Sequence, residues 1–233
     1  LLFSNLKRLE DINSRVGKIQ VIYAGKAHPN DWMGKRLIEE IYEMKEQLKD
    51  IMKVVYLENY GMEMASKLTS GVDVWLNTPL PPFEASGTSG MKAAHNGVIN
   101  FSVLDGWWIE GCVEGVTGWS IGPHPKELVT DEERREVELR DLYSKLEYLI
   151  APTFYGDRDA WIELMKNSIA RIAHYFQIQW VMGRYITEAS RGAQALLAAP
   201  VREGRPANRR ALDQTNPQAS LQTLSPGQAW QEN

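Results

Sequence analysis

Short runs of β-branched and aromatic residues alternate with helix-forming stretches along the first half of the chain. Four such runs, each closed by glycine, proline or polar residues, fall at residues 19–24, 53–57, 72–76 and 98–103. Strands separated by helices pair in parallel, because each helix returns the chain to the same end of the sheet. The pattern therefore predicts an α/β fold, a Rossmann-like parallel sheet with helices on both faces.

Helix signals fill the intervals and continue through the second half of the chain. The expected helices run from residue 4, with Ser4 as N-cap, from residue 30 or 31 to about 50, over 62–68, over 131–149, and from 157 to about 185. After residue 190 the composition changes to proline, glutamine, asparagine, serine and arginine with little periodicity. We therefore expect one domain over residues 1–190 and a disordered tail over residues 191–233.

Composition excludes several classes of protein. A net charge of -4 without a basic stripe argues against a nucleic-acid partner, and no apolar run is long enough to span a bilayer. The single cysteine, Cys112, cannot form an internal disulfide, so a cytoplasmic, reducing compartment is expected. The spacing of Cys112 and the four histidines predicts no metal site.

Residues 84–97 read Glu-Ala-Ser-Gly-Thr-Ser-Gly-Met-Lys-Ala-Ala-His-Asn-Gly and hold the strongest functional signal. Their small side chains leave backbone N–H groups accessible to a ligand, and a helix is expected to begin at Thr88 or Ser89. A helix N-terminus preceded by glycine and serine suits a phosphate group. Lys92 lies about one turn inside this helix, where it suits covalent attachment of a phosphorylated aldehyde such as pyridoxal phosphate.

The segments that follow the predicted strands are expected to share one rim of the sheet. Gly25, Asn59, the loop at residues 79–90, and Asp105 each come directly after a strand or close behind one. In open parallel sheets, ligands bind beyond the carboxyl ends of the strands. The rim that carries the glycine-rich turn is therefore the expected binding edge.

Several motifs of the chain resemble the α-glucan phosphorylases, the family of glycogen, starch and maltodextrin phosphorylases. Residues 84–92 resemble the segment of that family whose lysine carries pyridoxal phosphate. Ala-Gly-Lys-Ala-His-Pro at residues 24–29 and Leu-Glu-Asn-Tyr at residues 57–60 resemble two upstream motifs of the family. Leu-Asp-Gly-Trp-Trp-Ile-Glu-Gly at residues 104–111 resembles the shorter bacterial and archaeal type. The resemblance covers residues 1 to about 185.

The resemblance implies the C-terminal half of a two-domain glycosyltransferase-B-type fold. It also implies pyridoxal-phosphate-dependent phosphorolysis of terminal α-1,4-glucosyl units to glucose 1-phosphate, with retained configuration. The implied catalytic residues are Lys92, Glu84 and Thr88; the implied cofactor-binding residues are Lys92, Gly87, Thr88 and Tyr60; the implied substrate-binding residues are Glu84, Ala85, Ser86 and Gly87. The implied partners are an α-1,4-glucan, inorganic phosphate and glucose 1-phosphate, with neither nucleic acid nor membrane among them.

The chain also departs from the family pattern. Ser89 and Gly90 stand where the animal enzymes have Gly-Asn, and Gly61 stands where they have an arginine. The first domain of the family, and a segment with an arginine and a lysine that hold the substrate phosphate, have no counterpart here. We therefore expect this chain to be an incomplete C-terminal domain that needs the missing N-terminal domain as a partner.

Two other functions are considered. The first is a nucleotide-sugar-dependent glucosyltransferase of the same fold. Such enzymes often carry a second acid, which binds the ribose of the nucleotide, eight residues after the position of Glu84. Here that position is Lys92, and a lysine cannot accept hydrogen bonds from ribose hydroxyls. The isolated chain could also be an inactive half-domain. Structural roles compete at single residues as well: Lys92 as a solvated helix lysine, Glu84 as a loop acid, and Trp107 and Trp108 as core residues rather than a sugar groove.

Overall fold

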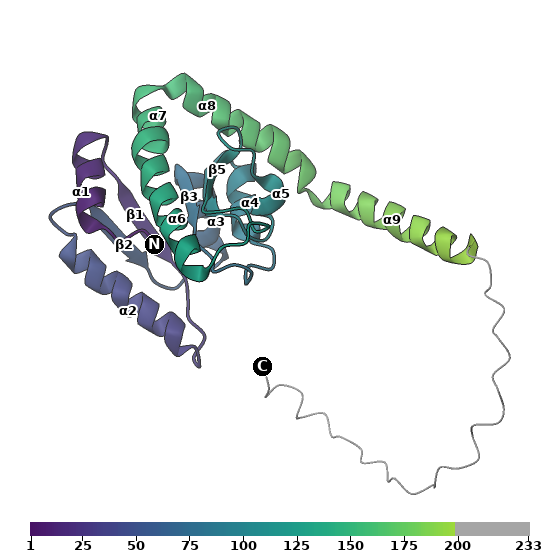
Figure 1. Cartoon of the computed structure of the whole chain (residues 1–233), viewed down its shortest axis with the longest axis horizontal. Helices are drawn as coiled ribbons and strands as arrows, with labels where there is room; N and C mark the ends of the chain where they lie inside the picture. Colours follow the sequence, from purple (N-terminus) through teal and green to yellow (C-terminus); the bar gives the residue numbers. More distant parts are fainter. Residues whose placement is uncertain (199–233) are drawn as a thin grey trace, which may run out of the picture. The chain divides into compact units, whose positions relative to one another are not determined.

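The computed structural model describes residues 1–198 of the chain, with side chains through residue 191 (Figure 1). It divides into two units, Leu1–Ile186 and Thr187–Asn233. The first unit is an α/β domain with parallel strands flanked by helices, as the sequence predicts. The strands do not form one continuous sheet. They form two, of two and three strands, and residues of both contribute to one hydrophobic core.

The first sheet pairs β1 (Gln20–Ala24) with β2 (Lys53–Leu57) in parallel, with Gln20 opposite Lys53. Helix α1 (Leu6–Arg15) precedes it, and α2 (Trp32–Gln47) connects its strands. The N-cap of α2 is Asp31, one of the two residues predicted for that position; its side chain accepts a 2.8 Å hydrogen bond from the Gly34 N–H.

The predicted N-cap of α1 is wrong by one residue. The side chain of Asn5, not that of Ser4, accepts the hydrogen bond from the Arg8 N–H, at 3.0 Å. The Ser4 N–H instead donates to the Leu1 carbonyl in the preceding turn. An asparagine amide reaches the first free N–H of a helix as readily as a serine hydroxyl does, so the two neighbours compete for the cap.

The second sheet has the order β3 (Val74–Asn77), β4 (Ile99–Val103), β5 (Gly118–Ile121), and all its pairs are parallel. Helix α3 (Met62–Gly71) leads to β3, α4 (Thr88–His95) connects β3 to β4, and α5 (Trp108–Gly111) precedes β5. Every residue of β4 is buried, as expected for a strand with neighbours on both sides. The sequence did not predict β5, which is short and begins with glycine.

The second half of the unit is helical, but its helices are more broken than predicted. Helix α6 (Asp131–Lys145) passes through a π-helical turn (Leu146–Ile150) into α7 (Ala151–Gly156). Helix α8 (Arg158–Asn167) passes through a second π-helical turn (Ser168–Ala173), and α9 (Ile178–Ala198) follows after a break. The domain boundary predicted after residue 190 falls inside α9, whose alanine-rich end favours a helix. Residues 199–233 of the predicted tail lie outside the described residues.

One hydrophobic core lies between the sheets and the helices. Leu9 and Ile12 from α1, Phe101 from β4, Leu142 from α6 and Trp161 from α8 are all almost fully buried within it. Burial of large apolar side chains is the main source of stability in such a domain. This core fixes β4 and thereby the rim segments that follow it.

Candidate functional site

The glycine-rich turn leads directly into α4, which begins at Thr88, as predicted. Gly87 is the N-cap in a left-handed conformation, with φ of 89°, and no side chain caps the helix. A Cβ atom on Gly87 would lie only 2.9 Å from Glu84 Oε1 and 2.9 Å from Trp107 Cδ1. Glycine is therefore required here by both backbone conformation and space. The first N–H groups of α4 consequently have no side-chain acceptor.

The loop before the turn is held from the end of β4. The Glu84 N–H donates to Asp105 Oδ2 at 2.9 Å, and the Gly106 N–H donates to Asp105 Oδ1 at 2.9 Å. The Trp107 N–H donates to the Ser86 carbonyl at 2.8 Å. Asp105 itself is buried, with 7% of its surface exposed. The rim prediction is thus confirmed for this pair of segments: the loop after β3 and the residues after β4 are in direct contact.

The start of α4 rests on two buried side chains. Asn100 in β4 donates through Nδ2 to the Gly90 carbonyl at 3.1 Å. The ring of Trp107 lies against both Gly87 and Gly90. Trp107 and Trp108 are 6% and 0% exposed, so their predicted alternative role as core residues is the correct one. Asn100 and Trp107 thus support one side of the turn, whereas Ala85, Ser86 and Thr88 are exposed to solvent.

Lys92 and Tyr60 lie on or next to two helices that pack against each other. Lys92 lies on α4, four residues after Thr88, and its side chain is exposed; within residues 1–198 its ammonium has no hydrogen-bond or ion-pair partner. Tyr60 is half-buried and follows Asn59, which has a φ of 56° at the end of β2. Helix α3 begins just after Tyr60 and packs against α4. No hydrogen bond among the described residues joins Tyr60 to residues 84–92.

Most of the predicted site residues therefore fall in one continuous segment. Glu84 and Gly87 are partly exposed, Ala85, Ser86 and Thr88 are exposed, and Lys92 follows on the same helix. The sequence analysis did not assign supporting roles to Asn100 and Gly106. A Cβ atom on Gly106 would lie 2.6 Å from the Ser86 carbonyl oxygen, a contact between residues distant in sequence that local spacing does not reveal.

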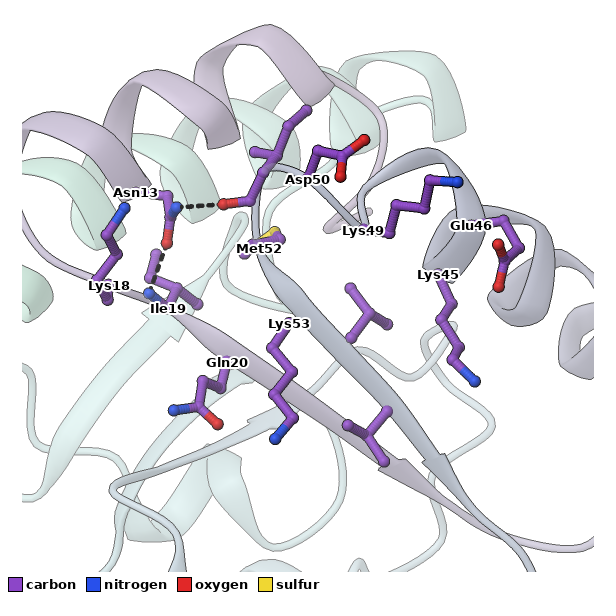
Figure 2. Close-up of a pocket in the computed structure, with 13 residues that line it drawn as sticks. Asn13, Lys18, Ile19, Gln20, Lys45, Glu46, Lys49, Asp50, Met52 and Lys53 are labelled. Carbon is purple, nitrogen blue, oxygen red and sulfur yellow. Dashed lines mark hydrogen bonds between the residues drawn. The ribbon is translucent and has the colours of Figure 1, made fainter.

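A hollow of about 630 Å³ lies elsewhere on the molecule, next to the first residues of β1 and β2 (Figure 2). Figure 2 shows Gln20 on β1 and Lys53 on β2 among its lining residues, together with Lys45 near the end of α2 and Lys49 just after it. This is the amino end of the strands, whereas parallel sheets bind ligands beyond the carboxyl ends. We therefore locate the candidate site at the glycine-rich turn rather than in this hollow.

The described residues offer neither a metal site nor a membrane-spanning helix. Within residues 1–198 no cluster of histidine, cysteine, aspartate and glutamate has the geometry to hold a metal ion. In the same part of the chain, no helix combines the length and the apolar character needed to cross a membrane.

Comparison with known proteins gives consistent matches. A family profile described as carbohydrate phosphorylase matches residues 1–175. The chain is 42% identical over 187 residues to the maltodextrin phosphorylase of Thermococcus litoralis, covering 80% of this chain and 22% of that protein. It is 40% identical over 195 residues to the glycogen phosphorylase of Aquifex aeolicus, covering 81% of this chain and 27% of that protein. The chain thus spans about a quarter of the length of these relatives.

Proposed function

The chain belongs to the carbohydrate phosphorylase family, and from this premise we propose that it is the part of an α-glucan phosphorylase that holds pyridoxal phosphate and the glucosyl unit. The parent enzyme transfers the terminal α-1,4-linked glucosyl unit of a glucan to inorganic phosphate, with retention, and releases glucose 1-phosphate. The chain described here needs the N-terminal domain of that enzyme for turnover.

The observation that carries this proposal is the combination of an uncapped helix N-terminus with an unpaired lysine in the same helix. The N-terminus of α4 presents backbone N–H groups and the positive end of the helix dipole, which together favour an anion such as a phosphate. Lys92 lies about one helical turn further on, with no partner in the described part of the chain. A phosphate on the turn and an aldehyde at the lysine match the two ends of pyridoxal phosphate.

The residues present fit this group. Ala85, Ser86 and Thr88 are exposed and carry small side chains, so a ligand can approach the main chain of the turn closely. Lys92 would hold the group covalently, and Thr88 and Tyr60 would hydrogen-bond to its phosphate. When bound, pyridoxal phosphate supplies a phosphate that titrates near neutral pH and can therefore donate and accept a proton.

The segment before the turn suits a sugar. Glu84 offers a carboxylate that accepts hydrogen bonds, and the N–H groups of Ala85, Ser86 and Gly87 are donors that no acceptor in the described residues occupies. A glucosyl unit has hydroxyl groups that donate and accept, so acceptor and donors side by side are complementary to it. These chain groups orient the glucosyl unit, and the N–H groups next to the phosphate site offset the repulsion between two anions.

The test uses the full-length parent enzyme. Lys92→Ala is expected to remove both bound pyridoxal and phosphorolysis of maltodextrin. Borohydride reduction of the unmodified enzyme, followed by peptide mapping, should place the pyridoxyl label on the peptide that contains Lys92. Lys166→Ala is the matched control, because Lys166 is an exposed lysine on α8 that pairs with Glu163, at 2.6 Å. Full activity and pyridoxal content in Lys92→Ala would refute the proposal.

Two further measurements separate the alternatives. Calorimetric titration of the parent with a nucleotide sugar should give no binding heat, whereas a nucleotide-sugar transferase would bind it. The 233-residue chain alone, supplied with maltodextrin, phosphate and pyridoxal phosphate, should form no glucose 1-phosphate. Turnover by the isolated chain would show that the N-terminal domain is not needed.

A further inference from the structure

Asp105 connects the central, fully buried strand of the second sheet to the proposed sugar-binding loop. It follows β4 after one intervening residue, and every residue of β4 is buried. Both oxygens of its carboxylate are used: Oδ2 accepts from the Glu84 N–H and Oδ1 accepts from the Gly106 N–H, each at 2.9 Å. Hydrogen bonds to a charged acceptor are the stronger kind, particularly when buried. Asp105 thus fixes Glu84, the first residue of the loop, relative to β4.

The loop is restrained on both sides of Ala85. Before it, the Glu84 N–H is fixed by Asp105; after it, the Ser86 carbonyl is fixed by the Trp107 N–H at 2.8 Å. Gly106 allows this approach, because any side chain there would collide with the Ser86 carbonyl oxygen. Ala85 and Ser86 are exposed, and neither side chain anchors the loop within the described residues. The directions of the N–H groups at residues 85–87 therefore depend on the hydrogen bonds that the loop backbone makes with Asp105 and Trp107.

We propose that Asp105 is a positioning residue for the glucosyl unit: it holds the loop so that the N–H groups of residues 85–87 converge on the sugar hydroxyls. This inference rests on the proposed function. We assign Asp105 to the loop and not to the sugar, because its side chain is buried and each of its oxygens accepts a backbone N–H of the loop or of Gly106. Asp105 acts on the orientation of these donors. When the donors are misplaced, the affinity for the glucosyl unit and the rate of its transfer fall, although every binding group is still present.

The chemistry of the side chain predicts a graded series of variants. Asparagine keeps one acceptor oxygen and turns an NH₂ group toward the second backbone donor, so one of the two hydrogen bonds is lost. Alanine loses both. In the full-length parent we expect kcat/KM for glucose 1-phosphate to fall about tenfold to a hundredfold in Asp105→Asn, and further in Asp105→Ala. The KM for inorganic phosphate and the pyridoxal content should stay at the level of the unmodified enzyme.

The matched control is Asp157→Asn. Asp157 also accepts a backbone N–H through its carboxylate, from Ala160 at 3.0 Å, but it caps α8, and no hydrogen bond in the described part of the chain joins it to residues 84–92. It therefore undergoes the same chemical change without the proposed effect. Asp105→Asn should melt a few degrees below Asp157→Asn, because the hydrogen bond that it loses involves a buried side chain, whereas that of Asp157 is exposed. At a temperature where both variants are fully folded, only Asp105→Asn should lose catalytic efficiency.

Amide hydrogen exchange gives a readout that does not depend on activity. Peptides covering residues 84–87 should exchange faster in Asp105→Asn than in the unmodified parent, and should be unchanged in Asp157→Asn. If the unmodified parent shows no phosphorolysis, the proposed function fails, and exchange at residues 84–87 still decides whether Asp105 holds the loop. Should Asp105→Ala not fold, Asp105→Asn carries the test alone.

Three results would overturn the inference. One is unchanged exchange at residues 84–87 in Asp105→Asn. Another is unchanged kcat/KM for glucose 1-phosphate in an active parent. The third is a loss of activity in Asp105→Asn that is fully accounted for by lost pyridoxal content and a large drop in melting temperature. Asp105 would then support the fold as a whole and not the orientation of the loop.

Discussion

Gly90 offers a direct test of how tightly the turn is packed. It lies in the first turn of α4, is buried, and its carbonyl accepts the hydrogen bond from Asn100. On helix propensity alone, Gly90→Ala should stabilise the helix by about 1 kcal/mol. The surroundings of the residue predict the opposite sign, so the two effects can be separated by one substitution.

The magnitude follows from the distances. A Cβ atom on Gly90 would lie 2.7 Å from Asn100 Oδ1 and 3.0 Å from Trp107 Cζ2. Asn100 is 1% exposed and Trp107 is 6% exposed, so neither can move away without disturbing the core. Overpacking of this kind costs about 1–3 kcal/mol, and displacing Asn100 weakens a buried hydrogen bond worth about 1 kcal/mol more. After subtraction of the propensity gain, we expect Gly90→Ala to be destabilised by about 1–3 kcal/mol.

Equilibrium urea unfolding, followed by tryptophan fluorescence, measures this difference. Gly71→Ala is the control: Gly71 ends α3 and has no atom within 4 Å of the built Cβ position. The control should be stabilised by about 0.4–1 kcal/mol, because alanine reduces the freedom of the unfolded chain. If Gly90→Ala proves as stable as Gly71→Ala, the turn is not packed against Asn100 and Trp107 as described.

Two more predictions concern ionisable groups. Burial opposes ionisation of Glu147, but hydrogen bonds from Arg15 at 2.5 Å and Arg8 at 3.0 Å outweigh it and lower the pKa of its carboxyl group. A carboxyl group whose pKa is lowered by folding stabilises the fold at pH values above its unfolded pKa of about 4.3. Glu147→Gln should therefore lower the free energy of unfolding by about 1–2 kcal/mol at pH 7. In urea unfolding experiments, this difference between variant and unmodified chain should shrink below about pH 4. Burial, followed by the charge of Glu114, raises the pKa of the Cys112 thiol to about 12. Iodoacetamide at pH 8 should therefore label Cys112 slowly in the folded chain and quickly in urea, and equal rates would contradict this burial.

The parts of the fold that the sequence predicted are those with strong local patterns. The strands β1 and β2 were placed within one residue, because their apolar runs end at residues that disfavour strands. The start of α4 at Thr88 was also predicted, since small residues give way there to good helix formers. By contrast, β5 contains glycine and serine, and becomes a strand only because β4 offers it a paired edge. Tertiary pairing of this kind leaves no local signal.

The same distinction applies to the candidate site. Residues 84–92 were identified from their composition, which already describes a turn that exposes its backbone. The role of Asp105 was not identified, because its partner Glu84 lies 21 residues earlier in the sequence. The choice of Asn5 over Ser4 as N-cap also depended on geometry, since both residue types favour that position. The sequence therefore indicates the groups that we propose to bind ligands, and the three-dimensional structure adds the residues that contact and support them.

The division of the strands into two sheets has a practical consequence for anyone who purifies this chain alone. Within the described residues only β4 has a partner on both sides, so β1, β2, β3 and β5 each leave one row of peptide groups unpaired. Ile22 of β1 is 45% exposed, which adds an apolar side chain to one of these open rows. Open, apolar strand edges are templates on which a second molecule can extend the sheet. Self-association should rise with protein concentration, and a lysine at position 22 should reduce it.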